Sequence, residues 1–150
     1  MPLPILLVEP NALIRQTVAL TAASLALGPV QQATSLQAGQ RMMQEQNFSS
    51  VILPLHADGD EDGVELFAQL YALRAGATLS GENIPVYVTA SACSREEVEQ
   101  LLALRVQRVL IKPFKTRTLI DVLSEVAVVP AAGTERAAAT GDSDDSVRAV

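Results

Sequence analysis

The chain has 150 residues, 49% hydrophobic and 19% charged, which suits one domain with a buried core and excludes disorder over its whole length. Its formal net charge of -6 and its aromatic content of 3% argue against nucleic acid as a partner, because phosphates attract cations and bases stack on aromatic rings. The single cysteine, Cys93, excludes an intramolecular disulfide and a zinc site built on paired thiolates.

The sequence shows neither a membrane span nor a targeting segment. No run approaches the roughly 18 apolar residues that a helix needs to cross a bilayer. The opening MPLPILLVEP lacks the basic start and the long apolar run of a signal peptide. We therefore expect a cytoplasmic protein without membrane association.

The first part of the chain predicts two strand–helix pairs. The apolar run Pro4–Val8 is typical of a strand, and Asn11 can cap a following helix that ends at Gly28. A second strand over Val30–Thr34 then leads to a polar helix over Ser35–Gln46. Strand and helix therefore alternate from the start.

The middle of the chain predicts two more pairs. The apolar run Ser50–Leu55 predicts a strand, and Val64–Ala75 carries apolar residues at helical spacing after an acidic loop. The run Ile84–Thr89 predicts a fourth strand. Ser94 and Glu97 then form a capping box, which begins a fourth helix because the two residues satisfy each other's backbone amides.

The last pair is followed by a change of composition. Val109–Ile111 predicts a short strand, and Thr116 can cap a helix that ends at Val126. Residues 127–150 are mostly Ala, Thr, Ser, Gly and Asp without apolar periodicity, which is typical of a disordered tail. We expect one domain over residues 1–126 and a disordered C-terminal tail over 127–150.

Strict alternation of five strands with five helices predicts an α/β fold, a doubly wound five-stranded parallel sheet with helices on both faces. In such sheets, ligands and chemistry gather at the carboxyl ends of the strands. The residues that follow those ends are the candidates for a site: Glu9, Pro10, Pro54, Thr89, Ala90 and Lys112.

Five segments, in order and at suitable spacing, carry a family resemblance. They are ILLVEPN at 5–11, SSVILPL at 49–55, DG at 62–63, IPVYVTA at 84–90 and KPF at 112–114. Over nearly all of residues 3–126 the chain resembles the receiver domain of two-component response regulators, which is CheY-like. The resemblance implies a flavodoxin-like sheet with strand order 2-1-3-4-5.

The resemblance also implies a chemistry, phosphoryl transfer from a histidine kinase to an aspartate at the end of the third strand, assisted by Mg²⁺. Glu9 matches one of the family's two metal-binding acids, Thr89 its hydroxyl and Lys112 its lysine. Pro10 stands at the second acid and Pro54 at the phosphorylated aspartate, and proline has no side-chain oxygen. We therefore expect an atypical receiver, or pseudo-receiver, that is not an enzyme and holds neither metal nor cofactor in this degenerate pocket.

Two further expectations concern the same pocket. Without a phosphoryl group, the simplest partner of the Lys112 ammonium is the Glu9 carboxylate across adjacent strand ends. Val109 stands three residues before the lysine, where Tyr or Phe is typical of the family, so coupling from the hydroxyl to an aromatic ring is not expected.

The acidic loop after the third strand suggests two alternative functions. Anchoring the comparison on Asp62–Gly63 places Leu55, which also cannot be phosphorylated, at the acceptor position. A displaced loop carboxylate such as Asp58 could then serve a phosphoryl-accepting regulator. Asp58, Asp60 and Asp62 also spell half of a calcium loop, but its twelfth position is Gln69 instead of Glu. A third alternative is a flavodoxin-like protein that binds a small molecule at the strand ends. The chain lacks the glycine-rich phosphate loop that such sites favour, which argues against this alternative.

The resemblance assigns partner binding to the fourth helix, fifth strand and fifth helix, here roughly Ser94–Val126. Complementary charge can select a protein partner there, because this region is richer in cations than the rest of the acidic chain. A homodimer stays open. The basic residues of this expected partner surface are Arg95, Arg105, Arg108, Lys115 and Arg117.

Overall fold

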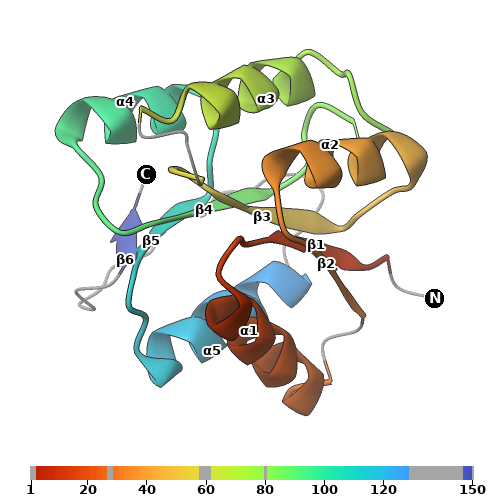
Figure 1. The fold of residues 1–150 in the computed structure, drawn as a ribbon, viewed down its shortest axis with the longest axis vertical. Helices are drawn as coiled ribbons and strands as arrows, with labels where there is room; N and C mark the ends of the chain where they lie inside the picture. Colours follow the sequence, from red (N-terminus) through yellow and green to blue (C-terminus); the bar gives the residue numbers. More distant parts are fainter. Residues whose placement is uncertain (1–2, 27–28, 58–61, 80, 129–146, 150) are drawn as a thin grey trace.

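The computed structural model describes residues 3–26, 29–57, 62–79, 81–128 and 147–149. Five parallel strands form the centre of the fold in the order β2-β1-β3-β4-β5 (Figure 1), which confirms the predicted sheet and its order. Their bounds are β1 Ile5–Val8, β2 Val30–Ala33, β3 Ser50–Pro54, β4 Val86–Ala90 and β5 Arg108–Ile111.

Helices cover both faces of this sheet. On one face lie α1 (Ala12–Ser24) and α5 (Thr116–Val128), and on the other lie α2 (Leu36–Glu45), α3 (Val64–Arg74) and α4 (Arg95–Ala103) (Figure 1). All residues of β1, β3 and β4 are buried, because a parallel strand between two helix layers packs on both faces. The two faces hold two separate apolar clusters, one beneath each helix layer.

Local signals in the sequence fix where the helices begin. The Asn11 side chain accepts a hydrogen bond from Ile14, and the Ser35 side chain accepts one from Ala38. Both halves of the capping box between Ser94 and Glu97 are present at the start of α4. A side-chain cap therefore marks the first turn of α1, α2 and α4.

One glycine lets a helix lie close to the sheet. A Cβ atom added at Gly39 in α2 would stand 2.5 Å from the Cγ2 atom of Val8 in β1. Real Cβ atoms do not approach another carbon so closely, so an alanine here would push α2 away from the end of β1.

The sheet has a sixth strand that the sequence did not predict. β6 (Val147–Ala149) pairs antiparallel with β5, with Arg108 opposite Ala149 and Leu110 opposite Val147 (Figure 1). For these residues the expected disorder was wrong, since the edge of β5 offers backbone groups to which a short segment can bond. α5 also extends past Val126 to Val128. Most of the expected tail lies outside the described residues, and the boundary at 126 stays a prediction.

Within the described parts of the chain, no helix combines the length and the apolar character needed to traverse a bilayer.

Candidate functional site

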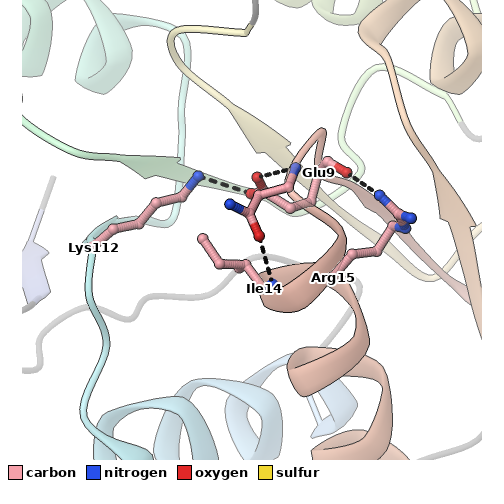
Figure 2. A network of polar contacts seen from close by, with 5 residues as sticks. Glu9, Ile14, Arg15 and Lys112 are labelled. Atoms are coloured by element: carbon pink, nitrogen blue, oxygen red, sulfur yellow. Dashed lines mark hydrogen bonds and ion pairs between the residues drawn. The ribbon is translucent and has the colours of Figure 1, made fainter.

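The buried carboxylate of Glu9 organises the carboxyl end of β1 (Figure 2). Its Oε1 atom accepts a hydrogen bond from Lys112 Nζ at 2.9 Å, and its Oε2 atom accepts one from the backbone N–H of Asn11 at 3.0 Å. The Glu9 carbonyl oxygen accepts a further bond from Arg15 Nη1 at 2.8 Å. A carboxylate taken out of water is tolerated only with such partners, and here both of its oxygens have one.

Lys112 reaches this carboxylate from the end of β5. The Lys112 side chain is 18% exposed and that of Glu9 only 3%, so the ion pair is largely shielded from solvent. The backbone N–H of Lys112 donates to the Ala90 carbonyl of β4 at 2.8 Å, which anchors the base of the side chain beside the neighbouring strand. The ion pair predicted between these two residues is thereby confirmed.

Pro54 lies where the ends of the third and fourth strands meet. It is buried at the last position of β3, and the register of the sheet pairs it with Thr89 in β4. The next residue, Leu55, is also fully buried, and its N–H donates to the Thr89 carbonyl at 2.8 Å. Neither side chain next to Thr89 on this strand therefore carries an oxygen.

Among the described residues the Thr89 hydroxyl has no hydrogen-bond partner, although the residue is only 4% exposed. It lines a small cavity together with Glu9, and the remaining lining is apolar and comes from the sheet, from α1 and α5, and from Phe114 between β5 and α5. A buried hydroxyl without a partner costs free energy. This Thr89 hydroxyl belongs to the pocket that the sequence predicted, but nothing in the described structure uses it.

The candidate site at the strand ends has three described polar side chains: Glu9 and Thr89, which line the cavity, and Lys112, which is paired with Glu9. Pro10 follows Glu9 and adds no oxygen ligand. Among the described residues, no group of three or more His, Cys, Asp or Glu side chains is placed to hold a metal ion. The one carboxylate that remains already accepts two hydrogen bonds, so the described residues do not form the multi-carboxylate site that Mg²⁺ usually occupies.

The position three residues before the lysine is fully buried. Val109 lies in β5 at 0% exposure and belongs to the apolar cluster beneath α2, α3 and α4. A branched aliphatic side chain in that cluster has no polar tip with which to reach the Thr89 hydroxyl. The described pocket therefore offers no aromatic route from Thr89 to the outer surface of β5.

The acidic-loop candidates fall largely outside the described residues. Asp58 and Asp60 belong to the segment 58–61 that is not described, so the calcium loop and the displaced phosphoryl acceptor both stay predictions. Asp62 is described and exposed. It is followed by Gly63, whose φ of 72° is readily adopted by glycine and which directly precedes α3.

The five basic residues predicted on the partner surface are divided between two ends of the molecule. Arg95 begins α4, and Lys115 and Arg117 follow β5, so all three lie at the carboxyl end of the sheet. Arg105 and Arg108 lie at its amino end, between α4 and β5 and at the start of β5. The Arg95 side chain is 93% exposed, and its Nε atom lies 3.8 Å from Glu99 Oε2. The sequence predicted a single basic patch, whereas the fold separates these residues into two groups.

A contact between His56 and Glu97 was missed. His56 Nε2 lies 3.0 Å from Glu97 Oε2, which joins the segment after β3 to the first turn of α4. Burial raises the pKa of Glu97, but the hydrogen bonds from the Ser94 backbone N–H and from His56 outweigh it and hold the pKa below its usual value. Sequence spacing shows the capping box but gives no signal for a partner 41 residues away.

A second missed feature is the arginine at the end of α3. The Arg74 guanidinium donates to four carbonyl oxygens at 2.7 to 3.0 Å, which belong to Glu82, Ile84, Leu104 and Arg105. Burial, and secondarily the charge of Arg105, lowers the pKa of Arg74 to about 10. The side chain thus remains a cation at neutral pH and ties the loops before β4 and β5 to α3.

The comparisons with known proteins agree with this architecture. The family model for the response regulator receiver domain matches residues 5–124. No curated protein matches the chain. The chemotaxis protein CheY4 of Vibrio cholerae is similar in structure, with a TM-score of 0.69 and 23% identity over 84% of this chain and 99% of that one.

Two other solved structures show the same fold at lower identity. A CheY-like receiver domain protein from Methanospirillum hungatei has a TM-score of 0.68 and 18% identity, covering 85% of this chain and 94% of that one. HP1043, an orphan response regulator of Helicobacter pylori, has a TM-score of 0.67 and 14% identity, covering 83% of this chain and 92% of that one.

Proposed function

The chain belongs to the family of response regulator receiver domains, signalling modules of two-component pathways, and from that premise we propose that it acts as a pseudo-receiver. In this role it binds protein partners without being switched by aspartate phosphorylation. The observation that carries the proposal is the pairing of Pro54 with Thr89, which leaves no carboxylate beside that hydroxyl on β3. The family's reaction needs a phosphoryl acceptor at that position if it is to use the hydroxyl and the lysine.

The Glu9–Lys112 ion pair supports the same proposal. In the reaction that the family resemblance implies, the lysine contacts a phosphoryl oxygen and the acidic residue helps hold Mg²⁺. Here the two side chains bind each other at 2.9 Å, and Pro10 has no carboxylate that could help Glu9 hold Mg²⁺. The cation and the carboxylate thus satisfy each other without any ligand, which favours a single state of the pocket.

Intact mass spectrometry after incubation with acetyl phosphate and Mg²⁺ tests the proposal directly. We expect no Mg²⁺-dependent gain of a phosphoryl unit on the natural chain. The double variant Pro10→Asp/Pro54→Asp restores the two missing carboxylates, and we expect it to gain one acid-stable, hydroxylamine-sensitive phosphoryl unit. A gain on the natural chain would overturn the proposal.

The alternative function, a regulator that accepts a phosphoryl group on a displaced loop carboxylate, is resolved in the same assay. If the natural chain gains a phosphoryl unit and Asp58→Asn abolishes it, that alternative is correct. Asp62→Asn is the matched control, because it removes one carboxylate from the same acidic stretch.

We place partner binding on the face formed by α4, β5 and α5. The exposed cations Lys115 and Arg117 lie at one end of β5, and the net charge of the chain is -6, so these cations stand out from an acidic surface. Opposite charge on a partner would be attracted to them and would fix its orientation.

Capture of the native partner tests this placement. Arg105→Glu/Arg108→Glu is expected to weaken capture, but Arg105 also donates to Asn83 Oδ1 at 3.3 Å. The variant Lys115→Glu/Arg117→Glu avoids that contact and is the cleaner test. We expect both variants to reduce retention of the partner, most strongly at low salt. Undiminished capture by both would contradict the placement.

A further inference from the structure

β5 is the last parallel strand of the sheet, and its outer edge is occupied by a segment of the same chain (Figure 1). β6 pairs with it over three positions, Arg108 with Ala149, Val109 with Arg148 and Leu110 with Val147. The pairing is antiparallel, whereas every other pair in the sheet is parallel. β6 is thus an added strand outside the βα repeat that builds the fold.

The edge of β5 is suited to accept such a strand. Val109 and Leu110 are buried and hold the backbone of β5 firmly between the two helix layers. A rigid edge strand presents fixed N–H and C=O groups, which an extended segment can bond without distorting the sheet. Recognition by strand addition draws its affinity from these main-chain bonds.

We propose that the edge of β5 is a strand-docking site, that β6 occupies it as an internal competitor, and that the partner of this protein adds an extended antiparallel segment in its place. The inference rests on the proposed function, because β5 lies at the centre of the face assigned to partners. It adds that the partner binds through an extended peptide segment. It also adds that β6 must be released before this segment can bind.

Charge specifies the segment further. Because Leu110 pairs with Val147 and Arg108 with Ala149, residues that precede an occupant's strand run toward the carboxyl end of β5. The exposed cations Lys115 and Arg117 follow that end. In this chain the residues before β6 are Asp144, Asp145 and Ser146. The partner segment that fits best therefore has acidic residues directly before its extended strand.

Residue-resolved amide hydrogen exchange on the full chain tests whether β6 covers β5. The variant Val147→Pro/Arg148→Pro/Ala149→Pro removes every amide donor of β6. Pairing is therefore lost whichever of these amides point toward β5. We expect at least one amide within Arg108–Ile111 to lose protection by about tenfold or more, while amides of β4 stay protected. The control Val147→Ile/Arg148→Lys/Ala149→Val keeps all donors and should retain protection. Equal protection in the proline variant would overturn the proposal.

Fluorescence anisotropy with a labelled peptide of residues 143–150 tests docking in trans. We expect the peptide to bind the proline variant at least about tenfold more tightly than the natural chain, because a tethered competitor acts at a high effective concentration. A peptide with Asp144→Asn/Asp145→Asn should bind the proline variant more weakly. Failure of the natural peptide to bind the proline variant, or equal binding to both chains, would overturn the proposal.

The oligomeric state separates internal competition from exchange between two copies. We expect protection of β5 in the natural chain to be independent of protein concentration. Concentration-dependent protection would place the strand of a second copy on β5 and overturn the internal competition. No phosphoryl donor is present in these assays, so their failure is distinct from a failure of the pseudo-receiver proposal, which the acetyl phosphate assay decides.

Discussion

At the scale of single residues, the polar side chains at the carboxyl ends of β1, β4 and β5 are those of Glu9, Thr89 and Lys112. Proline at positions 10 and 54 removes two possible oxygen ligands, and the remaining carboxylate of Glu9 turns to Lys112 and to a backbone amide. Within the described part of the chain, Glu9 and Lys112 thus have hydrogen-bond partners and the Thr89 hydroxyl has none. The ion pair is thus the residue-level feature on which the stability of the pocket depends.

Replacing Lys112 with Met should destabilise the fold. The change leaves the Glu9 carboxylate buried with one hydrogen bond and no counter-charge, and breaking a buried pair in this way costs about 2 to 4 kcal/mol. Urea unfolding followed by circular dichroism measures the loss. The double variant Glu9→Gln/Lys112→Met removes the stranded charge and should recover more than half of it. An unchanged unfolding midpoint for the single variant would argue against the pair as a stabilising contact.

At the scale of elements, the sequence was most informative where the signal is local. The Asn11 cap and the capping box at Ser94 depend on neighbours a few residues away, and α1 and α4 begin where these signals predicted. The Glu9–Lys112 pair was also predictable, because parallel topology brings the ends of β1 and β5 to the same edge of the sheet.

Contacts between elements that are distant in the sequence could not be predicted from local sequence signals. Arg74 resembles any exposed cation at a helix C-terminus, and only the folded loops reveal four carbonyls around it. β6 has three residues and no periodicity, so its pairing depends entirely on the edge that β5 presents. Tertiary context decides these features, and a single sequence does not encode it in any nearby pattern.

Arg74 should be more important for stability than a surface arginine. Arg74→Met leaves four carbonyl oxygens without their donor, and we expect a loss of about 2 to 4 kcal/mol because hydrogen bonds to a charged group are strong. Arg74→Lys keeps the charge but not the planar fork, so it should recover only part of the loss. Thermal unfolding compares the two variants, with Arg95→Met as the exposed control. Equal effects of Arg74→Met and Arg95→Met would contradict the role of the carbonyl cluster.

The first turn of α4 should make stability depend on acidic pH. The folded-state pKa of Glu97 is below its unfolded value, so the folded state binds fewer protons than the unfolded state at pH values between the two. Its contribution is therefore present above the unfolded pKa of about 4.3 and is lost as pH falls through the lower folded pKa. Glu97→Gln should be less stable than the natural chain at neutral pH, and the difference should shrink in acid. Chemical unfolding across this range checks it, and a difference that grows in acid would contradict the sign.

At the scale of the whole molecule, the chain has the receiver fold, and the proposed pseudo-receiver function concerns how that fold responds to a phosphoryl group. The order of the five parallel strands and the five helices around them match the CheY-like structures to which the chain is similar. A ligand shifts such a scaffold only if it binds one state better than another. In the described pocket, the groups that would bind a phosphoryl mimic are the paired Lys112 ammonium and an isolated hydroxyl.

Addition of beryllofluoride with Mg²⁺ should therefore leave the whole domain unchanged. The mimic needs an acceptor carboxylate and a metal held by several oxygens, and neither Pro10 nor Pro54 supplies one. We expect the amide NMR spectrum of the natural chain to show no shifts in α4, β5 or α5. Pro10→Asp/Pro54→Asp should respond, because the carboxylate introduced at the end of β3 would stand beside Thr89 and Lys112 would gain a competitor to Glu9. Shifts on the natural chain that spread from Thr89 and Lys112 to β5 would show that the site still binds a phosphoryl mimic and would contradict the pseudo-receiver proposal.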